Sequence, residues 1–198
     1  INGPVVYLKG NTGFKMSEMV YVGKERLVGE VIALTKDTTT VQVFEETTGL
    51  KPGETVTASG DALSVTLGPG ILNNIFDGIE RPLSEIAKQS GKYISRGLTV
   101  DSLDTEKKWD VHVTVSEGEE LMGGAIIAET QETRSIVHKS MVPPDVNGTV
   151  IWAAKDGKYT ILDPIVKLKL EDGTEKEITL AQKWPIRIPR PTHKRFPA

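Results

Sequence analysis

Short apolar segments, separated by turns rich in glycine and proline, run through the first third of the chain. Val41 and Val43 alternate with polar residues, which places both on one face of a strand. Pro52 and Gly53 supply the fixed and the permissive backbone angles of a tight turn. Strands are expected over residues 5–8, 20–22, 27–34, 39–45 and 54–59. The pattern predicts a mainly β fold that opens with a small closed β-barrel, or a compact sandwich, over residues 1–67.

A different spacing of apolar residues follows Gly68 and Gly70. It is helical, and it predicts one short helix that Gly78 and Pro82 interrupt. A second helical turn is expected over residues 82–89. The first stripe comprises Ile71, Leu72, Ile75, Phe76 and Ile79, and the second is expected to bury Leu83, Ile86 and Ala87. Residues 68–94 are therefore expected to form a short helical connector.

The alternating pattern returns at Trp109, where Val111 and Val113 flank His112. Two later segments each carry an acidic residue and a glycine before an apolar strand, and residues 171–174 predict a hairpin turn. This layout predicts that residues 95–184 form a second, flattened β-barrel resembling a barrel-sandwich hybrid. Residues 185–198 are rich in proline and lack periodicity, so we expect a linker there.

Composition excludes several classes of protein. The chain has 198 residues, 38% of them hydrophobic, a net charge of -3 and no cysteine. These values fit a globular protein and exclude disulfide frameworks, thiolate metal sites and cysteine nucleophiles. No apolar run is long enough to span a bilayer and no basic field is present, so we expect neither direct membrane insertion nor a nucleic-acid partner. The absence of cysteine suits a cytoplasmic location.

The chain lacks a phosphate loop. Such a loop requires G-x-x-x-x-G-K followed by serine or threonine, but the three Gly-Lys pairs precede Glu25, Tyr93 and Tyr159. The Gly68-Pro69-Gly70 segment lacks the third glycine of a dinucleotide fingerprint, and its proline removes an amide donor. We therefore expect no cofactor site and no catalytic residue in this chain.

The titratable residues do not combine into a metal or acid–base site. His112, His138 and His193 each lack a second ligand at metal-binding spacing, and His112 is expected to face solvent. Neighbouring glutamates, at positions 45 and 46 and at 119 and 120, should point to opposite faces of a strand. The basic tail has no interleaved aromatic residues to stack bases, so a solvated or interdomain role is favoured. The tail comprises Arg187, Arg190, Lys194 and Arg195.

Two alternative functions stay open. The paired hairpins resemble the biotinyl/lipoyl carrier fold, in which a modified lysine sits at a hairpin tip, and Lys139 would be the candidate. Pro143 and Pro144 follow almost at once, however, and no methionine precedes the lysine. The other alternative is a small β-rich binding module.

Several blocks in order resemble the catalytic A subunit of V-type and archaeal A-type ATP synthases. The block FDGIERPL at residues 76–83 is the most distinctive of these. The others are INGPVV at 1–6, VYVG at 20–23, RLVGEV at 26–31, VQVFEETTGL at 41–50, LGPGIL at 67–72, HKSMVP at 138–143 and QKWPIR at 182–187. The ordered set is more specific than any single block.

This resemblance implies a role for each part. Residues 1–67 would be the barrel that joins other A subunits and the B subunit in a crown of six, and residues 95–184 the bulge, or non-homologous region, that contacts the peripheral stalk. The parent would make or hydrolyse ATP, coupled to proton or sodium transport, at the cytoplasmic side of the cell membrane. Mg-ATP would bind in a later nucleotide-binding domain. The chain is thus expected to be an N-terminal fragment that performs assembly and is not itself an enzyme.

The resemblance also suggests a docking segment in the connector. It implies interdomain docking there, with Arg81 on an exposed shoulder, against the simpler interpretation of an ordinary helix terminus. The candidate docking residues are Phe76, Asp77, Gly78, Ile79, Arg81 and Pro82.

Overall fold

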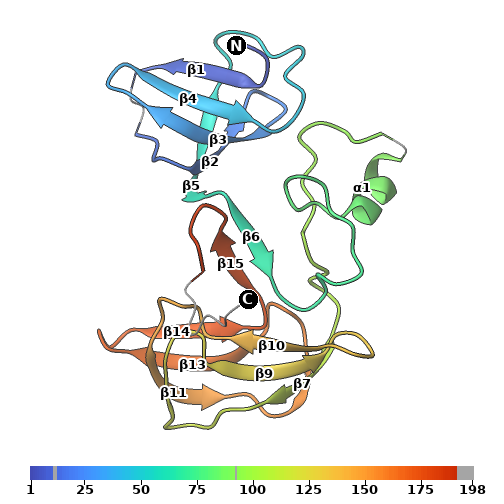
Figure 1. The fold of residues 1–198 in the computed structure, drawn as a ribbon, viewed down its shortest axis with the longest axis vertical. Helices are drawn as coiled ribbons and strands as arrows, with labels where there is room; N and C mark the ends of the chain where they lie inside the picture. Colours follow the sequence, from blue (N-terminus) through green and yellow to red (C-terminus); the bar gives the residue numbers. More distant parts are fainter. Residues whose placement is uncertain (11–12, 92, 191–198) are drawn as a thin grey trace, which may run out of the picture. The chain divides into compact units, whose positions relative to one another are not determined.

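The computed structural model describes residues 1–10, 13–91 and 93–190, and these residues are mainly β, as predicted (Figure 1). They form fifteen strands and one helix. The strands of the first half are β1 (Val5–Lys9), β2 (Glu18–Val22), β3 (Leu27–Leu34), β4 (Thr38–Val43), β5 (Val56–Ala62) and β6 (Ser64–Leu67), followed by helix α1 (Leu83–Ser90). The later strands are β7 (Trp109–Val113), β8 (Glu120–Leu121), β9 (Ile126–Gln131), β10 (Val137–Met141), β11 (Gly148–Ala153), β12 (Gly157–Tyr159), β13 (Pro164–Leu170), β14 (Glu175–Thr179) and β15 (Gln182–Pro185).

The chain divides into two compact units that interleave along the sequence. The first unit contains Ile1–Val65, Ile75–Ser102 and Pro185–Arg187. The second contains Thr66–Asn74, Leu103–Trp184 and, among the described residues, the stretch from 188 to 190. Strands β6 and β15 pair with each other in a two-stranded sheet.

The first unit is built on a five-stranded antiparallel sheet in the order β1-β4-β3-β2-β5. Val41 and Val43 lie in its core, which confirms the alternation predicted for β4. Gly29 in β3 has no space for a side chain, because a Cβ there would lie 2.8 Å from the carbonyl oxygen of Gln42. β1 pairs with β4 alone and β5 with β2 alone, so no strand pairing among the described residues closes this sheet into a barrel.

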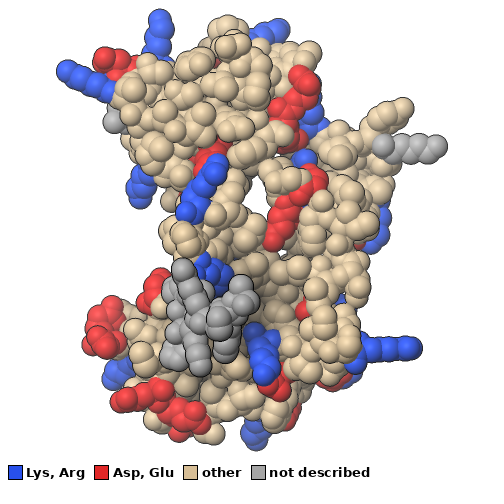
Figure 2. All heavy atoms as spheres, in the orientation of Figure 1, with Lys and Arg blue, Asp and Glu red and all other residues tan. Residues whose placement is uncertain are grey.

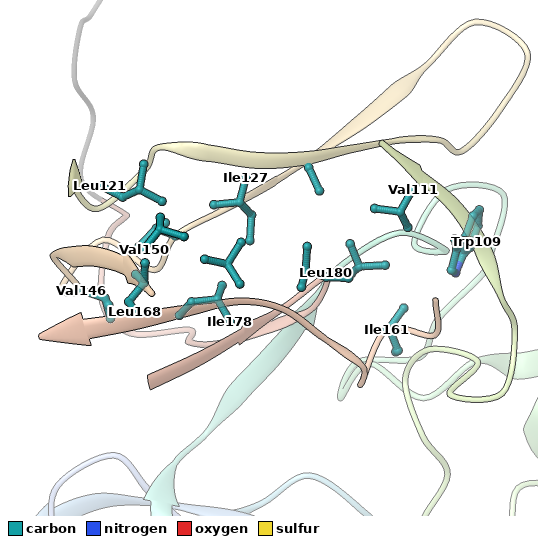
Figure 3. Packing of buried hydrophobic residues seen from close by; sticks show 14 of the residues in the cluster. Trp109, Val111, Leu121, Ile127, Val146, Val150, Ile161, Leu168, Ile178 and Leu180 are labelled. Atoms are coloured by element: carbon teal, nitrogen blue, oxygen red, sulfur yellow. The ribbon is translucent and has the colours of Figure 1, made fainter. Parts of the chain in front are cut away.

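The second unit contains two four-stranded sheets, in the orders β10-β9-β7-β12 and β14-β13-β11-β8. Figure 3 shows side chains of both sheets gathered around one apolar core, from Leu121 at one end to Trp109 at the other. Residues of β7 alternate as predicted, with Trp109 and Val111 in the core and His112 exposed. The predicted hairpin turn joins β13 to β14, with Gly173 at a φ of 84°. This arrangement agrees with the predicted barrel-sandwich fold.

The connector differs from its prediction, because residues 71–79 are not helical. The carboxylate of Asp77 accepts hydrogen bonds from the amides of Ile79 and Arg81, which offers this backbone an alternative to a helical turn. Asn73 and Glu80 also adopt left-handed backbone angles, with φ of 65° and 63°, which a right-handed helix cannot include. Apolar spacing alone therefore predicted the wrong structure for this segment.

Helix α1 corresponds to the second predicted helical turn. Ile86 is buried, as predicted, whereas Leu83 and Ala87 are exposed, so the prediction that they face inward was wrong. No helix among the described residues has the length and apolar character needed to cross a membrane.

Candidate functional site

The loop before α1 is organised around the guanidinium of Arg81. Its Nε donates to Asp77 Oδ2 at 2.7 Å, and its Nη1 donates to the carbonyl of Leu98 at 3.0 Å and to Glu45 Oε2 at 3.3 Å. The Arg81 side chain is only 10% exposed and that of Glu45 only 6%. Arg81 therefore ties the connector to the strand end after β4 inside the first unit. We call Arg81, Asp77 and Glu45 the arginine cluster.

Further hydrogen bonds satisfy both carboxylates of the arginine cluster. Glu45 accepts from the amides of Gly97, at 2.9 Å, and Val28, at 3.3 Å. Burial raises the pKa of Asp77, but hydrogen bonds from the amide and the guanidinium of Arg81 outweigh it and hold the pKa below its ordinary value. Each charged group of the cluster therefore has hydrogen-bonding partners, as buried charges require.

The predicted docking residues surround this cluster. Phe76 and Pro82 form an isolated antiparallel bridge, Gly78 is exposed, and Ile79 is half-buried. Arg81 is buried, so its expected position on an exposed shoulder was wrong: the charges of Asp77 and Glu45 draw it inward. The docking role of the segment stays a prediction.

A second buried carboxylate, that of Glu132, holds the glycine-containing loop of the second unit. Its Oε1 accepts hydrogen bonds from the amide of Gly70, at 2.8 Å, and from the amide of Leu72, at 3.0 Å. Its Oε2 lies 3.4 Å from Nδ1 of His138. Burial lowers the pKa of His138, and the Glu132 carboxylate opposes this shift only in part. We call this arrangement the Glu132 clip.

The outer face of the β10-β9-β7-β12 sheet carries a row of alternating charges. Lys139 Nζ lies 3.5 Å from Glu129 Oε1, Glu129 is the strand neighbour of His112, and His112 Nδ1 lies 2.7 Å from Asp156 Oδ2. The hydrogen bond with Asp156 raises the pKa of His112 and lowers that of Asp156. We call these four residues the outer row. Three of them, His112, Glu129 and Asp156, line a shallow open depression of the second unit together with Asp110.

Lys139 does not occupy the position that a carrier lysine requires. It lies in the middle of β10, paired in register with Glu129, and not at a hairpin tip. This placement contradicts the carrier hypothesis for Lys139, because a carrier lysine lies at a hairpin tip.

Two of the four basic residues of the C-terminal tail lie within the described part of the chain. Arg187 makes two hydrogen bonds to the buried Glu30 in β3, of 2.8 and 2.6 Å, which raise the pKa of the guanidinium above its ordinary value. Arg190 lies over the ring of Trp184. His193, Lys194 and Arg195 lie outside the described residues. Arg187 thus serves a contact within the first unit.

None of these clusters has the composition of a metal site: no group of three or more possible ligands occurs in residues 1–10, 13–91 and 93–190. The sequence patterns did not reveal Glu30, Glu45 and Glu132 as partners of buried polar contacts. Most of these contacts join residues at least 36 positions apart in the sequence, so local spacing does not reveal them. The exceptions are the Val28–Glu45 hydrogen bond and the contact between Glu132 and His138.

Comparison with known proteins identifies both β regions. Residues 1–60 match the family model described as "ATP synthase alpha/beta family, beta-barrel domain". Residues 100–187 match that of the "ATPsynthase alpha/beta subunit barrel-sandwich domain". Both models describe β domains, in agreement with the strands of the corresponding residues, and neither describes a carrier.

Curated relatives resemble the chain over nearly its whole length. The V-type ATP synthase alpha chain of Halothermothrix orenii is 49% identical over 197 residues, which is 100% of this chain and 33% of the relative. The A subunit of the A-type ATP synthase of Methanopyrus kandleri is 50% identical over 196 residues, 99% of this chain and 33% of the relative. That of Pyrococcus abyssi is 45% identical over 197 residues, 100% of this chain and 19% of the relative. The chain therefore spans a third or less of the length of these relatives.

Proposed function

The chain belongs to the ATP synthase alpha/beta family, and from this membership we propose that it forms the barrel and barrel-sandwich part of the A subunit of a rotary V-type or A-type ATP synthase. The observation that carries the proposal is the identity of 49% to a V-type alpha chain over 100% of this sequence. Its task is assembly, since the sequence contains no phosphate loop.

The proposed partners are those of a catalytic crown. The first unit would contact further A subunits and the B subunit, whereas the bulge would contact the peripheral stalk. The complex would act at the cytoplasmic face of the membrane, as a peripheral part, and would couple ATP synthesis or hydrolysis to proton or sodium movement. Mg-ATP would bind to residues outside this chain.

The arginine cluster supports this assignment physically. It fixes the loop of residues 76–82 from within the first unit by ion pairs of 2.7 and 3.3 Å. A loop held in one conformation loses little entropy when another domain packs on it. We therefore propose that this loop is the interdomain docking segment and that the buried side chain of Arg81 holds its conformation.

A chimera tests the proposal. This chain replaces the matching 197 residues of the Halothermothrix orenii alpha chain, and the product is combined with the other subunits of that enzyme. We expect a complex that hydrolyses ATP. A chimera that folds, by circular dichroism, but joins no complex would overturn the proposal.

The isolated chain supplies the complementary measurement. In a calorimetric titration we expect no heat of binding from Mg-ATP, because the sequence contains no G-x-x-x-x-G-K loop followed by serine or threonine to hold phosphate. Micromolar affinity would contradict the assignment of nucleotide binding to residues outside this chain.

A further inference from the structure

Helix α1 presents apolar side chains to solvent. Ile75 is 73% exposed and Leu83 is 38% exposed, and the two are adjacent because the amide of Leu83 donates to the carbonyl of Ile75 at 2.9 Å. Ala87, one turn after Leu83, is exposed as well. We call Ile75, Leu83 and Ala87 the α1 strip.

The charged residues of α1 lie on another side of the helix. Glu85 and Lys88 form an exposed ion pair of 2.6 Å, and helical geometry turns both away from Leu83 and Ala87. The segment after the helix adds two further apolar side chains, Tyr93 at 85% and Ile94 at 52% exposure. Figure 2 shows the surface around α1, at the right of the view, mostly without acidic or basic groups.

The first unit does not use this surface for its own folding. Only Ile86 of the helix is fully buried. The backbone that carries the strip is nevertheless held firmly, by the Leu83–Ile75 hydrogen bond and by the arginine cluster immediately before α1. Adjacent exposed apolar side chains on a fixed backbone favour packing against another protein surface.

Resting on the proposed function, we propose that the α1 strip packs against the part of the same subunit that the relatives carry beyond the matched region. The match covers 33% of the Halothermothrix orenii alpha chain, so two thirds of that chain lie outside it. The partner surface is apolar, because the strip offers no charge to pair with. The interdomain contact is thus made by the α1 strip, while the buried guanidinium of Arg81 supports it from behind.

Oxidative footprinting compares the strip in two proteins, each without other subunits: the 198-residue chain and the chimeric alpha chain described above. In the isolated chain, hydroxyl radicals should modify Ile75 and Leu83 rapidly. In the chimera their rates should fall roughly fivefold, because packed side chains are withdrawn from solvent. Leu162, which is 62% exposed in the second unit, is the matched control and should react equally in both proteins.

A substitution adds an energetic measurement. Leu83→Asp should leave the thermal unfolding midpoint of the isolated chain unchanged, because the side chain is exposed there. The same change should lower the midpoint of the chimera, where it places a charge in an apolar contact. Leu162→Asp should change neither midpoint.

The outcomes separate this proposal from the proposed function. Equal oxidation of the strip in both proteins overturns the docking contact, even if the chimera hydrolyses ATP. Concentration-dependent protection in the isolated chain also overturns it, since a second copy then covers the strip. Protection in a chimera that forms no complex supports the contact and contradicts the proposed function.

Discussion

The two units use ion pairs in opposite ways. In the first unit, Arg81, Asp77 and Glu45 are withdrawn from solvent and share hydrogen bonds with backbone groups. In the second, His112 and Asp156 make an equally close contact, 2.7 Å, but their side chains are 66% and 61% exposed. Distance alone would rank the two arrangements as equals. Burial distinguishes them. Removing one charge of a buried pair leaves its partner without water to solvate it, whereas water solvates the partner in an exposed pair.

The largest expected effect comes from Arg81→Ala. It leaves the buried carboxylates of Asp77 and Glu45 without their cation, so the free energy of unfolding should fall by about 3–5 kcal/mol. Urea titration followed by circular dichroism measures the loss. Arg81→Lys should recover only part of it, because lysine cannot reproduce the guanidinium fork. A loss no greater than that of an exposed substitution would remove the contrast between the units.

A smaller loss is expected from Glu132→Ala. The change deprives the amides of Gly70 and Leu72 of their acceptor and should cost about 1–3 kcal/mol. Hydrogen exchange at both amides should accelerate together. Glu117→Ala, an exposed change in the same unit, is the control. Unaltered exchange at the two amides would show that the clip does not hold the loop.

The two histidines among the described residues of the second unit, His112 and His138, should have pKa values shifted in opposite directions. The pKa of His112 is raised by Asp156, so its contribution to stability is complete below pH 6.5 and is lost as pH rises through the folded value. Asp156, whose pKa is lowered, contributes above pH 3.8 and loses this contribution as pH falls through its folded value. The pKa of His138 is lowered by burial, so protonating it as pH falls below 6.5 destabilises the fold.

Proton NMR of the two imidazole rings measures the direction of each pKa shift. Asp156→Asn should bring the pKa of His112 down towards its ordinary value of 6.5 and leave that of His138 where it is. An equal change in the pKa values of both histidines would mean that the general change in charge, and not the local hydrogen bond, sets the pKa of His112.

The smallest effect is expected from Lys139→Ala. The side chain is 54% exposed and its contact with Glu129 spans 3.5 Å, so unfolding free energy should change by less than about 0.5 kcal/mol. The same urea titration serves, with Arg81→Ala as the comparison. A loss of similar size in both variants would show that the outer row is as cooperative as the arginine cluster.

Sequence predicted the strands better than it predicted the contacts between them. The alternation around Val41 and Val111 identified core faces correctly, because a strand repeats every two residues and needs no tertiary information. The same periodicity placed His112 in solvent. The helical spacing of apolar residues gave a wrong prediction at residues 71–79. There the side chain of Asp77 accepts hydrogen bonds from nearby backbone amides, and a hydrophobic stripe does not encode such an interaction.

The candidate site depended on tertiary contacts, which sequence could not supply. The motif FDGIERPL marked the loop, but the burial of Arg81 follows from Glu45, 36 positions earlier. Glu132 reaches the amide of Gly70 across 62 positions, and Arg187 reaches Glu30 across 157. The sequence therefore did not distinguish Glu30, Glu45 and Glu132 from exposed glutamates, because their hydrogen-bond donors come close only in the folded chain.

The Glu132 clip has a consequence for how the second unit responds to dissolved anions. Backbone amides of a glycine-containing loop are the donors from which phosphate cradles are made. Here the amides of Gly70 and Leu72 already hold a carboxylate that the chain itself supplies. The carboxylate of Glu132 thus occupies the position that a bound anion would take, and free phosphate would have to displace this carboxylate to bind the two amides.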